Sequence, residues 1–173
     1  MIEWKSSQLP VPYPLVVVVS GNPPNPSTYI FYGQFNEHPP VIGIGIKKKR
    51  HTYKLIKETG DFTVNFVGRD MLRGADAAGM VSGRRVDKSN FFPWGASSKV
   101  KSPIIATAPL SLEVIYLRDI EFTDHLILLG EVKKIWAKKG VKPEDFILAT
   151  YSPMFYFLLG EKIQDWGFSG GKP

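Results

Sequence analysis

The 173-residue sequence contains no cysteine and only three histidines, His38, His51 and His125. The lack of cysteine excludes disulfides, thiolate metal sites and thiol catalysis. The histidines form no HExxH motif, and we expect no bound metal. Walker loops and G-x-S-x-G elbows are also absent from the sequence.

Long hydrophobic runs are missing too, since the longest apolar stretch, 14–19, has only the length of a strand. The N-terminal MIEWKSSQ lacks the basic start and apolar stretch of a signal peptide. We therefore expect a cytoplasmic protein with no membrane partner.

The chain has an excess of cations, with 22 basic and 16 acidic side chains and a net charge of +6. This excess favours an anionic partner, such as nucleic acid, an acidic membrane surface or a phosphorylated small molecule. No linker or repeat divides the chain, so we predict one domain over 1–173, with a flexible tail at 161–173.

Strand patterns dominate the sequence. Ser111 and Glu113, for example, alternate with apolar residues along 110–116. The predicted strands are 14–20, 28–35, 41–46, 62–67, 110–116, 126–136 and 154–159. The predicted helices are 52–59, 69–80 and 143–148. This pattern predicts a mainly β fold, a closed antiparallel barrel with a few short helices.

Four adjacent cations, Lys47 to Arg50, connect a strand to the predicted helix whose expected N-cap is Thr52. Such a run is most often a solvated turn. At a helix start, however, Arg50, the Thr52 hydroxyl and the free amides would suit a phosphate.

A second basic segment, SGRRVDK, covers residues 82–88. It is either a solvated loop or part of a binding site. Gly83 permits a backbone conformation that exposes N–H groups, and Arg84 and Lys88 could then reach an anion.

His125 stands at the mouth of a predicted hairpin. It is either an exposed turn histidine or a donor to a charged ligand or proton carrier. Gly43 and Gly45 begin a dinucleotide fingerprint that fails, because Lys48 occupies the place of its third glycine. The aromatics Tyr29, Phe31 and Tyr32 could stack nucleic-acid bases, but their strand pattern favours a barrel core.

Taken in order, YPLVVVVSG, NPSTYIFYGQFNEHPPVIGIGI, RHTYKLIKETGDFTVNFV, SGRRVDK and DHLILLGEV resemble the flavin reductase-like family. The resemblance runs from about residue 14 to about residue 159. It implies an FMN-binding split β-barrel, a homodimer, and reduction of flavin by NADH or NADPH.

The resemblance also implies site residues, by matching positions. His125 matches a histidine that positions the nicotinamide. The cofactor-binding positions it implies are Asn25, Ser27, Thr28, Tyr29, Lys49, Arg50, Thr52, Ser82, Gly83, Arg84 and Lys88. Ser27 stands where the family commonly has methionine, and Lys49 where it has a serine.

Three hypotheses follow. The first is an FMN-binding NAD(P)H:flavin oxidoreductase, which moves a hydride from the nicotinamide to N5 of FMN and passes electrons to a flavin, iron or protein acceptor. The second is an FMN-binding electron carrier without its own NAD(P)H activity. The third is a nucleic-acid-binding β-barrel. The resemblance favours the first, with no nucleic-acid partner.

Overall fold

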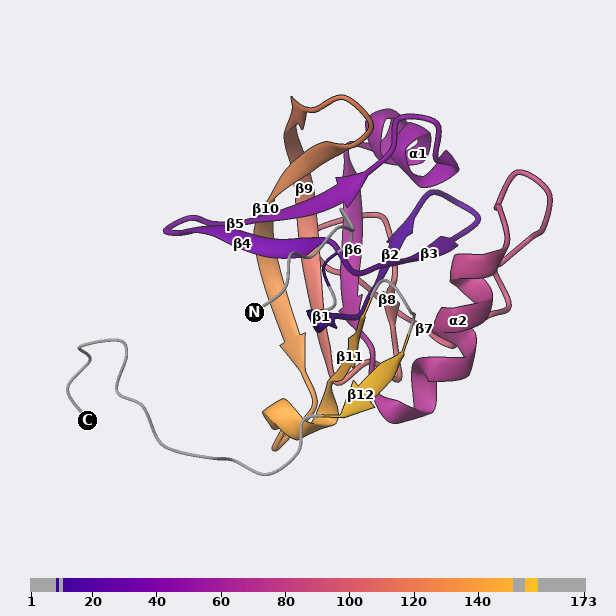
Figure 1. Ribbon diagram of the computed structural model, residues 1–173, viewed down its shortest axis with the longest axis vertical. Coiled ribbons are helices and arrows are strands. Elements are labelled where there is room, and N and C mark those ends of the chain that lie inside the picture. Colours follow the sequence, from indigo (N-terminus) through magenta and orange to yellow (C-terminus); the bar gives the residue numbers. More distant parts are fainter. Residues whose placement is uncertain (1–8, 10, 151–154, 159–173) are drawn as a thin grey trace, which may run out of the picture.

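The computed structural model describes residues 9, 11–150 and 155–158, and their fold is mainly antiparallel β (Figure 1). The main sheet has seven strands in the order β3-β2-β6-β9-β10-β5-β4. Its strands are β2 (Val16–Ser20), β3 (Asn25–Tyr29), β4 (Tyr32–Glu37), β5 (Pro40–Ile46), β6 (Asp61–Phe66), β9 (Leu110–Glu121) and β10 (Leu126–Ala137). The predicted fold class, a mainly β split barrel, is confirmed.

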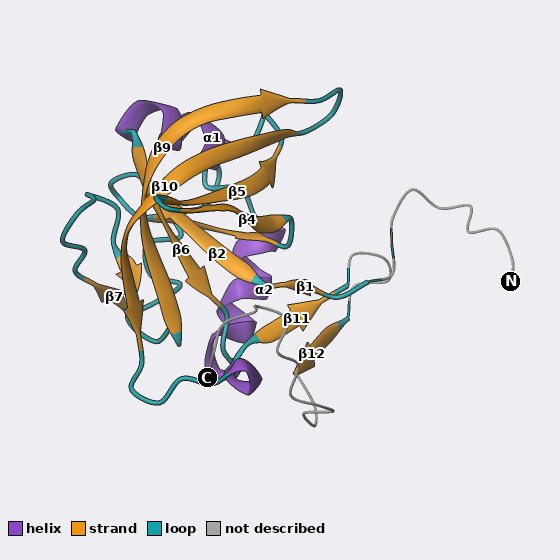
Figure 2. Cartoon of the chain, turned by 90° about the vertical axis from the view of Figure 1, so that its left-hand side faces the viewer, coloured by secondary structure: helices purple, strands orange, loops and turns teal. Residues whose placement is uncertain are grey.

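Smaller elements surround this sheet (Figure 2). Strands β1 (Tyr13–Pro14), β11 (Ile147–Ala149) and β12 (Tyr156–Leu158) form a three-stranded sheet, and β7 (Trp94–Gly95) pairs with β8 (Ile104–Ile105). The α-helices are α1 (His51–Thr59) and α2 (Leu72–Met80), with 3-10 turns at Arg69–Met71 and Pro143–Asp145. Within the described ranges, no helix is long and apolar enough to cross a membrane.

The main sheet curls until its two edges meet. Strands β3 and β4 stand at opposite ends of the strand order, yet only residues 30 and 31 separate them in the chain. The Gly45 amide of β5 donates a hydrogen bond of 2.7 Å to the Phe31 carbonyl within this connection. The connection therefore closes the barrel at the point where β3 leaves it.

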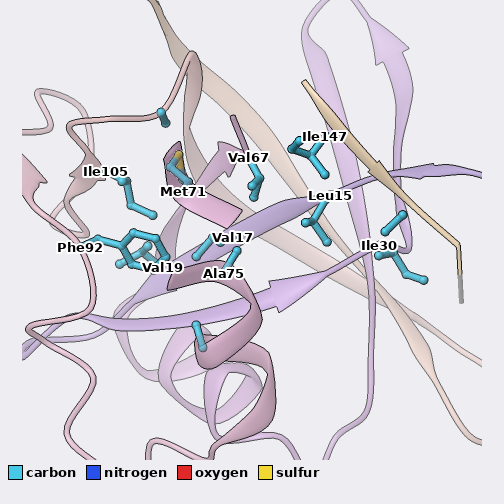
Figure 3. Close-up of a cluster of buried hydrophobic side chains, with 13 residues drawn as sticks. Leu15, Val17, Val19, Ile30, Val67, Met71, Ala75, Phe92, Ile105 and Ile147 are labelled. Carbon is cyan, nitrogen blue, oxygen red and sulfur yellow. The ribbon is translucent and has the colours of Figure 1, made fainter. Parts of the chain in front are cut away.

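Strand β2 lies between two hydrophobic cores. Val16 and Val18 pack inside the barrel, against α1 and the facing strands. Val17 and Val19 pack on the opposite side, beneath α2 and the three-stranded sheet, as Figure 3 shows. Because a strand sends alternate side chains to opposite faces, both faces of β2 must be apolar along 16–19, which explains its run of four valines.

Several predicted boundaries were wrong. The predicted strand 28–35 is interrupted at residues 30–31 and forms β3 and β4, and β3 begins at Asn25, three residues before the predicted start. The N-cap of α1 is Arg50 rather than Thr52, because the Thr52 hydroxyl is buried and accepts a hydrogen bond from Asn25. Helix 69–80 begins as a 3-10 turn, and only 143–145 of the predicted helix 143–148 are helical.

The predicted tail, 161–173, lies outside the described residues, as do Met154 and Leu159 of the last predicted strand. Tyr29 and Tyr32 pack against the core inside the barrel, as their strand pattern indicates.

A buried carboxylate, Glu113 of β9, holds the loop that follows β7. Its oxygens accept hydrogen bonds from the Ser98 amide at 3.0 Å, the Lys99 amide, and the Trp136 indole at 2.6 Å. Burial alone would raise the pKa of Glu113, but these hydrogen bonds outweigh it and lower the pKa. The alternation along β9 therefore carries a polar anchor rather than a solvated face.

We predict that Glu113→Gln lowers the free energy of unfolding by about 2 kcal/mol at pH 7, because three donors lose a charged acceptor. A carboxyl group whose pKa is lower in the folded state stabilises the fold fully at a pH above its unfolded pKa. This contribution is lost as the pH falls through the folded pKa. The difference between the variant and the wild type should therefore shrink in acid, below about pH 4.5. Urea unfolding at pH 7 and pH 4 measures this difference, and Glu37→Gln, at an exposed glutamate, serves as control. A difference that stays constant with pH would contradict this account.

Candidate functional site

A groove runs between β3 and α2, and it collects part of the predicted site. It consists of two adjoining cavities of about 150 and 520 Å³. Both are lined by Thr28, Tyr29, Ile30, Arg50 and Gly79. Ser27 and His125 line the smaller cavity in addition. Five predicted site residues, Ser27, Thr28, Tyr29, Arg50 and His125, therefore share this groove.

Small residues on α2 set the width of the groove. Figure 1 shows α2 beside β3, and the Thr28 hydroxyl donates a hydrogen bond to the Ala75 carbonyl across the gap. Gly79 faces the same threonine, where an added Cβ would lie 3.4 Å from the Thr28 Cβ. A larger side chain on this face of α2 would fill the space between helix and strand.

Arg50 brings positive charge into the groove at the start of α1. It occupies the N-cap position, where a guanidinium has no acceptor to offer the first-turn amides. No acidic residue lies in that first turn. The helix start is therefore electropositive, from both its side chain and its uncapped backbone.

Tyr29 is a buried wall of the groove. Its hydroxyl lies close to those of Ser27 and Thr52 but makes no well-directed hydrogen bond with either. Burial raises the pKa of Tyr29, against smaller opposing effects of Ser27, Thr52 and Arg50. The side chain is thus a neutral donor at physiological pH.

The SGRRVDK segment forms a second hollow, of about 430 Å³, beside the start of α1. Asn25, Gly83, Arg84 and Lys88 from the predicted set line it, together with His51. Gly83 lies so close to Asn25 that an added Cβ would stand 1.9 Å from its Oδ1. Gly83 is therefore required for close backbone approach, and its φ is not in the left-handed region.

Ser82 supports the turn of this segment. Its hydroxyl accepts a hydrogen bond of 3.3 Å from the Arg84 amide, and its carbonyl accepts from the amides of Arg85 and Val86. Like Thr52, Ser82 lines none of the four cavities that contain the other predicted residues. The structure thus gives Ser82 a local role in shaping the turn.

Lys88 is 3% exposed and links β3 to the end of α2. Its ammonium donates hydrogen bonds of 2.9 Å to the carbonyls of Pro26 and Ala78. Burial, together with the nearby Arg50 charge, lowers the pKa of Lys88 to about 8. The position suits a cation, because the C-terminal end of a helix carries partial negative charge.

His125 stands where the groove opens, in the turn between β9 and β10. Its Nδ1 lies 2.9 Å from the Asp124 carboxylate, and its ring packs edge-on against Phe31 with centroids 5.9 Å apart. The hydrogen bond to His125 is the largest cause of a lowered pKa at Asp124. The histidine therefore has a fixed orientation beside the groove.

The cationic run divides between two cavities. Arg50 lies in the groove, whereas Lys49, with Lys47 and Lys48, lines a cavity of about 470 Å³ on the side of the β9–β10 turn. Thr52 is buried behind Arg50 and is joined to Asn25 by a hydrogen bond of 3.2 Å. The predicted phosphate-binding turn is thus not one continuous surface.

Four residues of the site were missed in the sequence. His51 borders the SGRRVDK hollow, with an unpaired buried Nδ1 and a pKa lowered by burial and by Arg84. Asp76, Met80 and Tyr156 form the far end of the groove, where Tyr156 donates a hydrogen bond of 2.7 Å to Asp76. The only sequence signal was the small-residue run before SGRRVDK, which marks a helix packed closely on a neighbour.

Comparisons with known proteins agree with this geometry. The family model described as Flavin reductase like domain matches residues 7–158. An uncharacterised protein of Archaeoglobus fulgidus is 32% identical over 140 residues, which are 76% of this chain and 79% of that protein.

Two solved structures share nearly the whole fold. The flavoredoxin of Methanosarcina acetivorans is 25% identical, with a TM-score of 0.90 over 98% of this chain and 97% of its own. The flavoredoxin of Desulfovibrio vulgaris is also 25% identical, with a TM-score of 0.85 over 99% of this chain and 100% of its own.

The buried Lys88 should make stability depend on pH. Its folded pKa of about 8 lies below the ordinary lysine value of 10.5, so between these values the unfolded chain binds the extra proton. Stability then rises with pH through this window, by up to about 1.4 kcal/mol per pH unit. We predict that Lys88→Met removes this rise.

Chemical denaturation of both proteins between pH 7.5 and 9.5 tests the prediction. The upper limit avoids tyrosine ionisation, which acts in the opposite direction when a folded tyrosine pKa is raised, as at Tyr29. The free energy of unfolding of the wild type should rise with pH relative to that of Lys88→Met. A constant difference between the two proteins would show that Lys88 keeps its ordinary proton affinity.

Proposed function

Because the chain belongs to the flavin reductase-like family, we propose that it binds FMN in the groove between β3 and α2 and acts as an NAD(P)H:flavin oxidoreductase. The observation that carries this proposal is the groove itself. It joins an uncapped, cationic helix start to apolar walls and ends at an oriented histidine.

The cationic end of the groove fits a phosphate group. Arg50 supplies a planar pair of donors, and the first turn of α1 supplies backbone amides without a competing side-chain acceptor. Burial is the main cause of the lowered pKa of Lys88, and repulsion from the nearby Arg50 charge lowers that pKa further. A bound phosphate would relieve this repulsion.

The middle of the groove fits a flat aromatic ring. Leu15, Ile30 and Ala75 provide apolar surface, and Gly79 keeps the helix side low. The buried Tyr29 hydroxyl offers a donor with no well-directed internal partner. A pocket with apolar walls and a few fixed polar groups is the usual form of a cofactor site.

FMN, when bound, accepts a hydride from the nicotinamide at N5 and passes electrons on to a second flavin, iron or a protein acceptor. The chain's own contribution is to hold the phosphate at Arg50, to exclude water between β3 and α2, and to position the donor at His125. No side chain need act as an obligatory acid or base.

The purified protein should be yellow, and anaerobic NADH or NADPH should bleach it. Absorbance spectra before and after addition of each nucleotide measure both properties. A protein with no measurable affinity for FMN would refute the proposal.

A matched pair of variants tests where the FMN phosphate binds. Arg50→Gln should weaken FMN binding about tenfold or more, because a charged hydrogen-bond donor is lost. Arg85→Gln, which removes the same charge from the exposed side of the SGRRVDK segment, should change it less than about twofold. Equal losses would place the phosphate elsewhere.

A second candidate is an FMN-binding electron carrier that cannot use a nicotinamide nucleotide. It is supported by the two similar structures, both described as flavoredoxins. In that case the protein would be yellow but would keep its colour with either nucleotide, and a protein partner would reduce it instead.

We also propose that the protein is a homodimer. Phe35 of the edge strand β4 is 58% exposed, and it covers Gly43 on the outer face of β5. Phe31 covers Gly45 on the same face and contacts His125. A second copy docked on this face would bury the phenylalanines and narrow the opening of the groove.

Sedimentation equilibrium should give twice the chain mass of 19.4 kDa. Phe35→Ser should shift the protein toward the monomer, because it removes apolar area from the proposed contact. A wild-type protein that stays monomeric at high concentration would contradict the dimer without affecting FMN binding to one chain.

A further inference from the structure

A cationic cavity adjoins the groove at the side opposite α2. It lies between the turn that joins β5 to α1 and the turn that joins β9 to β10, and its volume is about 470 Å³. Three adjacent lysines line one side, Lys47, Lys48 and Lys49, and residues 121–125 line the other. Lys47 and His125 also line the groove, so the two spaces lie on either side of these shared residues.

The acidic residues of this cavity do not neutralise all of its lysines. Lys48 pairs with Glu121 at 2.8 Å, and Lys47 stands 3.9 Å from Asp124, which is also held by His125. Lys49 has no acidic partner among the described residues. Exposed pairs of this kind contribute little to stability, so their lysines can turn toward a stronger anion at small cost.

The division of the cationic run indicates two anions rather than one. Arg50 lines the groove, Lys48 and Lys49 line only the neighbouring cavity, and Lys47 lines both. A single phosphate at Arg50 would leave Lys49 without an anion and Lys47 and Lys48 with only exposed carboxylate partners. The second anion must belong to a molecule that also reaches the groove, because the spaces meet at His125.

We propose that the lysine cavity binds a phosphate group of the nicotinamide dinucleotide donor. This rests on the proposed function, since a donor with its nicotinamide ring beside His125 leaves the groove at that residue. Its phosphorylated part then continues into the adjoining cavity. The phosphate is either the pyrophosphate, common to both nucleotides, or the 2′-phosphate that only NADPH carries.

The test compares two double variants with the wild type. Lys48→Gln with Lys49→Gln removes two charges from the cavity. Lys138→Gln with Lys139→Gln removes two adjacent, exposed charges beyond the opposite end of β10 and serves as the control. Isothermal titration with 2′,5′-ADP and with ADP measures phosphate binding without electron transfer, and FMN affinity is measured alongside.

We expect the cavity variant to bind 2′,5′-ADP about tenfold more weakly than wild type, and any change in its FMN affinity to be much smaller. If ADP weakens equally, the lysines hold the pyrophosphate. If only 2′,5′-ADP weakens, they hold the 2′-phosphate, and the KM for NADPH should rise while that for NADH does not. Either result supports the cavity as a phosphate site of the donor.

Other results overturn the inference. These are a wild type that binds neither compound, a cavity variant that behaves like the control, or a single-stranded oligonucleotide whose tight binding depends on the same two lysines. A yellow protein whose nucleotide binding ignores the lysines refutes this inference alone. A protein without FMN affinity refutes the proposed function, whatever the titrations with 2′,5′-ADP show.

Discussion

Burial of β2 on both faces is the constraint on which the rest of the fold depends. Its valines supply both hydrophobic cores, so neither the barrel nor the α2 layer can form without it. In the main sheet, the edge strand β3 pairs only with β2. The position of β2 therefore fixes the position of β3 beside α2. That edge strand carries Ser27, Thr28 and Tyr29, and the groove follows from its position.

Positive charge in the site is held largely by backbone carbonyls rather than by carboxylates. Lys88 donates to two carbonyls, and Arg50 occupies the N-cap position of a helix that has no acidic residue in its first turn. A salt bridge here would satisfy the cations internally and leave nothing for an anion. The two carbonyls hold the Lys88 ammonium in place without neutralising its charge, so the charge can still attract an anion bound nearby.

Sequence patterns predicted the barrel well because its strands are long and regular in their burial. They failed where tertiary contacts decide local structure. Thr52 resembles an N-cap, but Asn25, 27 residues away in the chain, claims its hydroxyl. Lys88 resembles a ligand-binding lysine, and only the packed structure shows that it joins β3 to α2. Residues Asp76 and Tyr156 meet across 80 positions, which no local pattern can anticipate.

In the cationic run 47–50, the course of the backbone determines which cavity each charged side chain lines. Lys49 and Arg50 are neighbours immediately before α1, yet their side chains line different cavities. A count of charges treats the run as a single patch of four. Its geometry instead separates one guanidinium, which shares a wall with Tyr29, from three ammonium groups that face residues 121–125. A molecule that contacts both parts must pass His125, where the two cavities meet.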